Sequence, residues 1–383
     1  MLLIKNATVY TMENDVLENT DILVENSLIK EVGQNIQASA DEIIDASGMV
    51  VLPGFVDAHS HIGGFTANMV DQDVNEMTKN ITPEVESIYA IDYSSEYFDY
   101  ALKHGTTCSA IAPGSGNVIG GYVCAVKSYG KSMEDMVIKN PVALKMALGG
   151  NPKGVYGKKG KSPMTRMAIA QIIREYLNSV KDYMKKKEEA QGDMSKMPPY
   201  DQGLENGIPV IKKELPIKMH CTMMDMMTII RIAKEFDVNF TIDHAWGASD
   251  YYDEISESGV TGVIFGPIGV SKFPGECGKI DIYSLIELDK RGVPCAIMTD
   301  GPILKAEMMM VQAGEVVRYG GDVERVLRML TINPAEMLGI DDRVGSIKPG
   351  KDADIVIFKG TPALDTRASV KYTIINGEVV YKA

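Results

Sequence analysis

The sequence predicts a protein of the α/β class: a (β/α)8 TIM barrel with a small β-sandwich formed by its N- and C-terminal segments. Three observations indicate this fold. Residues 1–53 and 345–383 have the pattern of short strands separated by turn residues. Between them, apolar β-rich runs alternate with helical patterns, which is typical of repeated βα units. Eight such runs occur, the number of strands that closes this barrel.

The two terminal segments have the same sequence pattern of short strand-like stretches separated by turn residues. Their strand-like stretches are LLIKNATVYT, DILVEN, LIKEVG and DEIIDASGMVVLP near the start, and GSIKPGKDADIVIFKG and VKYTIINGEVVY near the end. Because both ends are rich in short strands and turns, we expect them to pair into one domain. The sequence thus divides into a sandwich domain of residues 1–53 and 345–383 and a barrel domain of residues 54–344.

The barrel domain contains eight candidate strands and one insertion. In chain order the strands are FVDAHSHIG, TTCSAIAPG, YVCAVKS, VALKMALGG, PIKMHCTM, NFTIDHAWG, GVIFGPIG and CAIMTDGP. A helical insertion of about residues 158–213 separates the fourth run from the fifth. Within it, apolar residues recur every three or four positions at Ile169, Ile173, Leu177, Val180 and Met184. This spacing predicts an amphipathic helix over 165–190 with one face on the barrel.

The composition argues against several classes of protein. Of the 383 residues, 45% are hydrophobic and 24% are charged, which is ordinary for a folded globular chain. A formal net charge of −13 repels polyanions, so nucleic acid is not expected as a partner. No apolar run is long enough for a membrane span, and the N-terminus lacks a signal-peptide pattern. The 5 cysteines have no CxxC spacing, which suits reduced thiols in a cytoplasmic protein.

Histidines gather where the barrel strands are expected to end. His59 and His61 close the first run, and residues i and i+2 of a strand point to the same side, so both imidazoles can face one metal ion. His220 closes the fifth run, His244 the sixth, and Asp300 the eighth. Any one of these residues alone is as readily structural as functional. Together, at the end where such barrels carry their active sites, they predict a metal-dependent site.

The same segments resemble the amidohydrolase superfamily, in particular its imidazolonepropionase-like and Xaa-Pro dipeptidase-like branch. The resemblance rests on LPGFVDAHSH, on TINPAEMLGIDDRVGSIKPGKDADIVIF and on the closing INGEVVY, and it covers almost the whole chain. It implies the barrel, the end-to-end sandwich and a hydrolase that acts on carbon–nitrogen bonds.

The resemblance also implies roles for the site residues. His59 and His61 would bind the more buried metal together with Asp300, and His220 and His244 would serve a second metal or the substrate. His244 and Asp300 would take part in catalysis, Asp300 by accepting a proton from the attacking water. The expected cofactor is a divalent metal, with zinc the first choice, as one or two ions; iron, manganese and nickel accept the same ligands.

Lys145, in the fourth run, decides between one ion and two. Relatives with two metals bridge them through a carboxylated lysine or a glutamate of that strand, so a carboxylated Lys145 is the candidate bridge. A lysine inside an apolar run is costly unless it is paired or modified. The alternatives are that Lys145 neutralises a buried carboxylate or points out of the barrel.

The expected reaction is hydrolysis of an amide C–N bond in a cyclic amide, an N-acyl compound or a dipeptide-like small molecule. Deaminases of the superfamily typically carry a glutamate three residues after the fifth-strand histidine, and here that position is Met223; Asp225 lies two residues further on. Heterocycle deamination is therefore the weaker alternative. A noncatalytic barrel scaffold is weaker still, because all five ligand positions are kept.

Other polar and aromatic residues lie near the expected mouth of the barrel. Tyr122, Asn151 and Trp246 are candidate substrate contacts, and so is Tyr129 at the far end of the third run. The glycine-rich stretch 113–121 lacks the lysine of a phosphate-binding loop and is interpreted as shaping the mouth. The expected partner is a small-molecule substrate, and a homo-oligomer is an open option.

Overall fold

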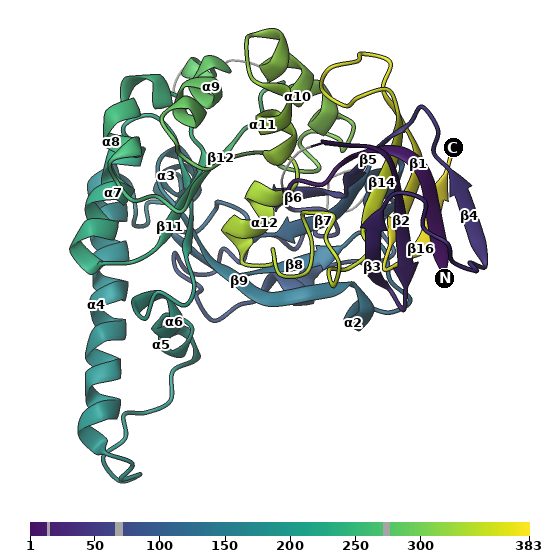
Figure 1. The fold of residues 1–383 in the computed structure, drawn as a ribbon. Coiled ribbons are helices and arrows are strands. Elements are labelled where there is room, and N and C mark those ends of the chain that lie inside the picture. The colour runs from purple at the N-terminus through teal and green to yellow at the C-terminus, as the bar shows by residue number, and fades with distance from the viewer. Residues whose placement is uncertain (14–15, 66–71, 271–275) are drawn as a thin grey trace.

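A computed structural model describes residues 1–13, 16–65, 72–270 and 276–383. Two eight-stranded sheets organise these residues. One sheet closes into a barrel, and the strands of the two chain ends form the other sheet at its side (Figure 1). The predicted class, an α/β barrel with a terminal β-sandwich, is confirmed.

The terminal sheet joins the beginning of the chain to its end. Its strands are β1 (Leu2–Tyr10), β2 (Val16–Glu25), β3 (Leu28–Gly33), β4 (Glu42–Asp45), β5 (Val50–Pro53), β14 (Ile355–Lys359), β15 (Ser369–Ile375) and β16 (Glu378–Lys382). The order is β16-β15-β14-β5-β1-β2-β3, with β4 beside β1. The central contact is antiparallel, between β5 and β14, and buried aliphatic side chains from both chain ends fill the core.

The barrel strands follow the predicted runs. They are β6 (Phe55–Ser60), β7 (Thr106–Ile111), β8 (Ile119–Lys127), β9 (Val137–Ala147), β10 (Ile217–Cys221), β11 (Phe240–His244), β12 (Gly262–Phe265) and β13 (Cys295–Ile297). They lie side by side in chain order. The seam between β13 and β6 is closed by a bridge between Ser60 and Gly301 and by the His61 amide, which donates to the Gly301 carbonyl at 2.6 Å.

One strand departs from the predicted βα repeat. β8 runs antiparallel to both β7 and β9, so β7 and β8 form a hairpin instead of a βα unit. The stretch 112–118 is the connection of this hairpin, and Gly120 and Gly121 already belong to β8. Gly121 has φ +110°, and a Cβ there would lie 2.3 Å from the carbonyl oxygen of Val85, so glycine is needed at this position.

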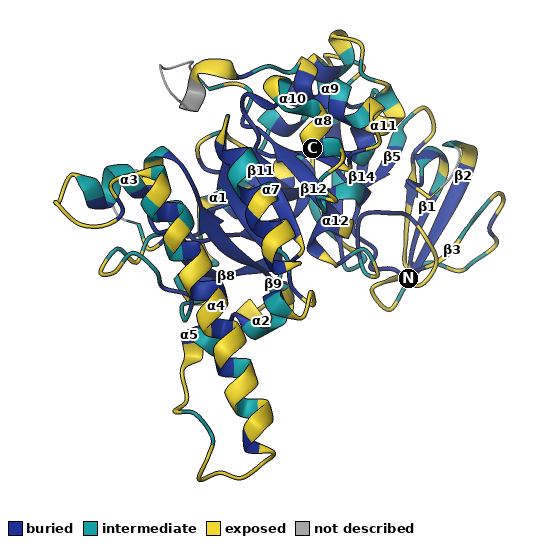
Figure 2. Cartoon of the chain, turned by 90° about the vertical axis from the view of Figure 1, so that its left-hand side faces the viewer, coloured by how far each residue is buried: buried dark blue, intermediate teal, exposed yellow. Residues whose placement is uncertain are grey.

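Helices cover the outside of the barrel. They are α1 (Glu96–Lys103), α2 (Met133–Met136), α3 (Gly150–Gly157), α4 (Arg166–Ala190), α5 (Gln202–Glu205), α6 (Ile208–Ile211), α7 (Asp225–Phe236), α8 (Tyr252–Ser256), α9 (Tyr283–Lys290), α10 (Met308–Arg318), α11 (Val323–Arg328) and α12 (Ile332–Leu338), with the short 3-10 turns η1 (Ser87–Ala90), η2 (Ala248–Asp250) and η3 (Glu276–Lys279). Their inward sides are buried and their outward sides exposed (Figure 2).

The long insertion forms α4 as the sequence predicts. Thr165 caps its start by accepting a hydrogen bond from the Ala168 amide, and Gln191 ends it in a left-handed conformation. Ile169, Ile173, Leu177 and Val180 are all buried. Within the described ranges, no helix combines the length and the apolar character that a bilayer span requires.

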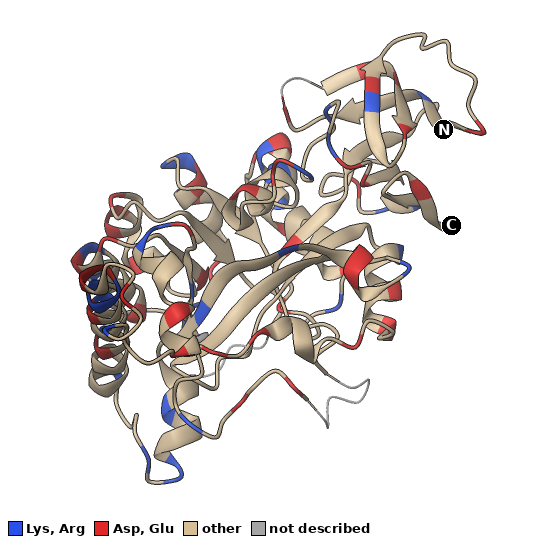
Figure 3. Ribbon diagram, turned by 90° about the horizontal axis from the view of Figure 1, so that it is seen from below, with Lys and Arg blue, Asp and Glu red and all other residues tan. Residues whose placement is uncertain are grey.

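Acidic and basic residues are interspersed over the helices (Figure 3). Pairs of opposite charge link neighbouring elements, as between Arg174 of α4 and Glu235 of α7, which lie 2.7 Å apart. The lysines near the end of α4 also have acidic neighbours, and Lys187 lies 2.6 Å from Glu205.

Candidate metal centre

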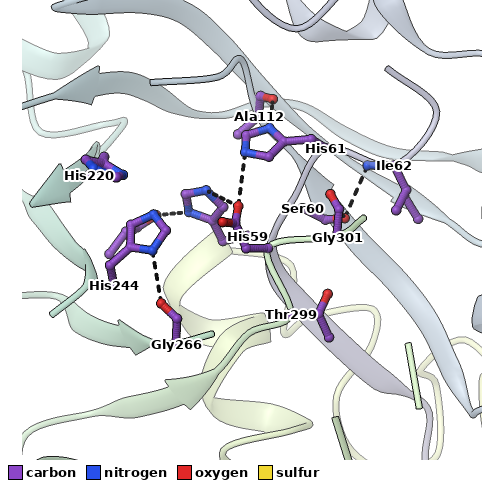
Figure 4. Close-up of polar contacts among 12 residues, drawn as sticks. His59, Ser60, His61, Ile62, Ala112, His220, His244, Gly266, Thr299 and Gly301 are labelled. Carbon is purple, nitrogen blue, oxygen red and sulfur yellow. Dashed lines mark hydrogen bonds and ion pairs between the residues drawn. The ribbon is translucent and has the colours of Figure 1, made fainter. Parts of the chain in front are cut away.

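The side chains of His59, His61 and His244 converge at the carboxyl ends of the barrel strands (Figure 4). The carboxylate of Asp300 lies among them. His59 lies in β6, His61 follows β6 directly, His244 is the last residue of β11, and Asp300 follows β13. One ligand atom from each of His59, His244 and Asp300 lies within 4.8 Å of the others. His61 joins them through its Nε2, 3.2 Å from Asp300 Oδ1. Nitrogen and oxygen donors in this number suit a divalent transition metal.

Each of these three imidazoles is held through its Nδ1 atom. The acceptors are an Asp243 carboxylate oxygen at 2.5 Å from His59, the Ala112 carbonyl at 2.7 Å from His61 and the Gly266 carbonyl at 2.9 Å from His244. Because an acceptor occupies each Nδ1, that nitrogen carries the proton and Nε2 keeps its lone pair. Three unprotonated nitrogens are thereby available as ligands.

The Nε2 atom of His59 supports an ion at this point. It lies 3.5 Å from Asp300 Oδ1, is buried and has no hydrogen-bond partner among the described residues. An imidazole lone pair that faces a carboxylate oxygen brings two acceptors together with nothing between them to donate. A cation bound by both atoms satisfies them, so the residues present fit a divalent metal.

Burial keeps the imidazoles in the form that binds metal. Removal from water lowers the pKa of His220 and of His244 to about 3, and the pKa of His59 also falls well below its ordinary value. These three histidines are therefore neutral at ordinary pH. Asp300 is the most open member of the group, with 15% of its side chain exposed. It is the residue placed to meet a substrate.

The backbone is strained at two of the ligand positions. His244 has φ 71° and Asp300 has φ 55°, in the left-handed region that residues with a Cβ seldom adopt. Asp57, buried two residues before His59, stabilises the second of these turns, since its carboxylate accepts hydrogen bonds from the hydroxyl of Thr299 at 2.5 Å and from its amide at 3.3 Å. Burial raises the pKa of Asp57 to about 6.

His220 lies beside this group without joining it. Its ring centroid is 4.3 Å from that of His244, and its Nε2 lies 3.4 Å from the side-chain nitrogen of Asn151. Its Nδ1 is buried and finds no partner within the described ranges. The structure thus brings His244 to His59 and Asp300 and leaves His220 at the edge of the group, close to Asn151.

Lys145 is fully buried in β9. Its ammonium nitrogen has no hydrogen-bond partner in the part of the chain that the structure describes. Burial lowers its pKa to about 8. Lys145 therefore lies inside the barrel near the candidate ligands, and the outward-pointing alternative does not apply.

The aromatic candidates differ in position. Trp246 lies next to the site, with its ring 5.2 Å from that of His244 and a buried indole N–H that has no described partner. The hydroxyl of Tyr122 instead donates to the Asn206 carbonyl at 3.0 Å, toward the insertion. Because β8 runs antiparallel, Tyr129 lies at the opposite rim, where its hydroxyl is 3.3 Å from Glu378.

Sequence reasoning missed three buried charged residues below the ligands. They are Asp57, Lys218 and Asp243. Lys218 Nζ lies 2.7 Å from Asp243 Oδ2, the oxygen that accepts from His59. Alternation along the strands carried the signal, because Asp57 precedes His59 by two residues and Lys218 precedes His220 by two, so each shares the inward face of its strand.

Comparisons with known proteins identify relatives of the chain. Two models described as the amidohydrolase family match residues 217–380 and 42–88. A crystal structure of an amidohydrolase from Thermotoga maritima MSB8 is 39% identical and superposes with a TM-score of 0.95 over 100% of both chains. The imidazolonepropionase of Picrophilus torridus is 25% identical over 98% of this chain and 97% of that protein.

The amidohydrolase tasK of Hapsidospora irregularis is 28% identical over 89% of this chain, which spans only 38% of that longer protein. Other relatives bear the names dihydroorotase and 5-methylthioadenosine/S-adenosylhomocysteine deaminase. The relatives are thus hydrolytic enzymes with different substrates. The predicted resemblance is confirmed, and this chain is an enzyme that belongs to the amidohydrolase family.

Proposed function

We propose that the chain is a metal-dependent hydrolase of an amide C–N bond in a small molecule, such as a cyclic amide, an N-acyl compound or a dipeptide-like substrate. The observation that carries this proposal is the convergence of three imidazole Nε2 atoms on the Asp300 carboxylate at the end of the barrel strands. Zinc is the metal that this mixed nitrogen and oxygen set suits first.

A divalent ion held by His59, His61, His244 and Asp300 would lower the pKa of a water molecule toward about 7 and polarise the scissile carbonyl. Asp300 is placed to accept the proton of the attacking water and to return it to the departing nitrogen, since part of its carboxylate is open to the mouth. His220, beside His244, would hold a second ion or donate a hydrogen bond to the carbonyl oxygen of the substrate.

We further propose that Lys145 becomes carboxylated and bridges two ions. Its lowered pKa leaves a sizeable fraction of neutral amine near pH 8, and only a neutral amine attacks CO2. The nitrogen forms a bond to carbon and loses one proton, and the resulting carbamate carries a negative charge. The unpartnered, fully buried nitrogen favours this modification over a simple ion pair.

Deamination has less support in this site. Met223, three residues after His220, has no group that transfers a proton to a departing amine. Asp225 is buried and its carboxylate lies 2.8 Å from Arg166, so it is held in an ion pair. Release of a new carboxylate and an amine from the substrate, without free ammonia from a purine or pyrimidine, distinguishes amide hydrolysis from this alternative.

Asp300→Asn tests the reaction. We expect turnover of a panel of cyclic amides and dipeptides to fall by about 10²–10⁴-fold, because an amide does not accept the proton. Circular dichroism should remain unchanged. Asp342→Asn, at an exposed carboxylate, is the matched control and should keep wild-type activity. Full activity in Asp300→Asn would show that another group is the base.

Metal content tests the proposed bridge. We expect about two metal ions per wild-type chain by elemental analysis, and one or fewer in Lys145→Ala, because the carbamate that links the two sites is lost. Lys139→Ala changes a lysine of the same strand that bonds the Gly339 carbonyl instead and should keep both ions. One ion per chain in both wild type and Lys145→Ala contradicts the bridging role and favours a mononuclear site.

A further inference from the structure

A chain of buried charges lies directly beneath the candidate ligands. It runs from Lys218 of β10 to Asp243 of β11 and on to His59 of β6, with each side chain at most 1% exposed. One oxygen of Asp243, Oδ2, lies 2.7 Å from the Lys218 ammonium and 2.5 Å from His59 Nδ1. The other oxygen accepts from the Thr241 hydroxyl at 2.8 Å.

These contacts keep Asp243 as a carboxylate. A charge without water around it is stable only when it is paired and hydrogen-bonded, and Asp243 has a cation and two further partners. Lys218 is the cation. Lys145 is its register partner on β9, yet it makes no such pair. The two neighbouring lysines therefore have different environments, one neutralising Asp243 and the other unpaired.

The carboxylate of Asp243 in turn determines which ring nitrogen of His59 is free to bind a metal. By accepting the Nδ1 proton, Asp243 fixes the tautomer with a free Nε2 and sets the direction of the ring. His61 and His244 have only a backbone carbonyl at the same place. A charged acceptor binds an N–H more strongly than a neutral one and makes the imidazole a better donor.

We propose that Asp243 is a positioning residue that holds His59 in its metal-binding tautomer, and that Lys218 neutralises Asp243 so that this buried carboxylate is tolerated. The inference rests on the proposed metal centre and extends it to two residues that touch neither substrate nor metal. In this view the ring of His59 is held more firmly than the other candidate ligands, because its partner is the charged pair of Asp243 and Lys218 in the barrel interior.

The test is the affinity of the full-length chain for Zn²⁺, measured by competition with a chromophoric chelator. We expect Asp243→Ala to bind the most tightly held ion about 10–100-fold more weakly than wild type. Asp243→Asn should show a smaller loss, because its amide oxygen still accepts from His59 without the charge. The visible spectrum of the Co²⁺ form should change most in Asp243→Ala, since the ring of His59 is no longer fixed there.

Two further variants separate this role from general stability. Asp354→Asn alters another buried carboxylate, paired with Lys127 away from the site, and should keep wild-type affinity. The double variant Lys218→Met with Asp243→Asn removes both charges, so it should fold and bind Zn²⁺ as weakly as Asp243→Asn.

Wild-type affinity in Asp243→Asn and in the double variant would overturn the inference, as would an equal loss in Asp354→Asn. Failure of the wild-type chain to bind Zn²⁺, Co²⁺ or any divalent ion would instead overturn the proposed metal centre itself, so the two failures are distinguishable.

Discussion

Several buried polar atoms without hydrogen-bond partners lie at or beside the candidate metal centre in the described part of the chain. His59, Lys145 and His220 each contribute one such atom, and all three lie at or beside the candidate metal centre. Folded proteins leave few buried polar groups unsatisfied, because each costs about 1–3 kcal/mol. The grouping of three such atoms in the barrel supports the proposed metal centre, whereas the hydroxyl of Tyr93 lies in an apolar cluster.

Tyr93 and Tyr122 give a prediction for alkaline stability. Burial raises the pKa of each to about 12 from the ordinary value of 10. The unfolded chain loses these protons near pH 10 and the folded chain near pH 12, so the folded state binds more protons between these values and the free energy of unfolding falls as pH rises through this window. Below pH 10 the two groups have no effect.

Urea unfolding at pH 7 and pH 11 measures this loss of unfolding free energy. At pH 7, Tyr93→Phe should match or exceed wild-type stability, because its hydroxyl has no described partner, whereas Tyr122→Phe should lose about 0.5–1.5 kcal/mol with its hydrogen bond to Asn206. Both variants should lose less stability than wild type on going to pH 11. If a variant loses as much unfolding free energy as wild type between pH 7 and pH 11, the replaced tyrosine does not have a raised pKa.

The candidate ligand residues could be identified from the sequence because they share a position at the carboxyl ends of the barrel strands, and the apolar runs of the chain indicate where these strands end. Alternation places Asp57 and Lys218 on the inward faces of their strands, but the contacts among the charged residues beneath the candidate ligands could not be predicted. Lys218 and Asp243 meet only because β10 and β11 pair in one particular register, and His59 reaches them across the barrel. Contacts of this kind depend on tertiary structure and leave no local pattern.

At the scale of elements, the periodicity of apolar residues predicts the buried face of α4 but not the direction of β8. An apolar residue at every third or fourth position places one face of α4 on the barrel, and the same face is buried in the structure. An apolar run such as β8 has no comparable sign of direction, because a buried strand looks the same parallel or antiparallel. Its short connection over 112–118 is the only local hint of a hairpin.

The reversal of β8 changes which loops form the mouth. The β7–β8 connection lies at the same rim as His61, and the Ala112 carbonyl at its start accepts the His61 proton. The next connection, after Lys127, opens at the opposite rim, near the terminal sheet. A hairpin therefore supplies one wall of the candidate site, where a βα loop followed by a helix was expected.

For the whole molecule, Lys127 joins the barrel to the terminal sheet. It is fully buried at the end of β8 and lies 2.7 Å from Asp352, 2.9 Å from Asp354 and 2.6 Å from the side-chain oxygen of Asn376. The sequence indicates that the chain ends come together, since both have the same strand and turn texture. It does not indicate the lysine that holds them to the barrel.

Lys127→Met should lower the free energy of unfolding by about 3–5 kcal/mol, because it leaves the buried carboxylate of Asp354 without its cation, while Asp352 keeps its ion pair with Arg343. Lys131→Met is the control, because Lys131 is 78% exposed and its ion pair with Glu378 is 3.9 Å long. Thermal and urea unfolding measure both. Equal stability of the two variants would mean that the buried cluster does not hold the domains together.

The pairing of β5 with β14 has a consequence for synthesis on the ribosome. The two strands lie about 300 residues apart in the chain, and at roughly 5–20 residues per second the ribosome needs about 15–60 s to make that length. Throughout this interval β5 lacks its partner strand on one side, while the barrel strands are synthesised one after another. The domain that begins the chain is thus among the last parts of the protein to be completed.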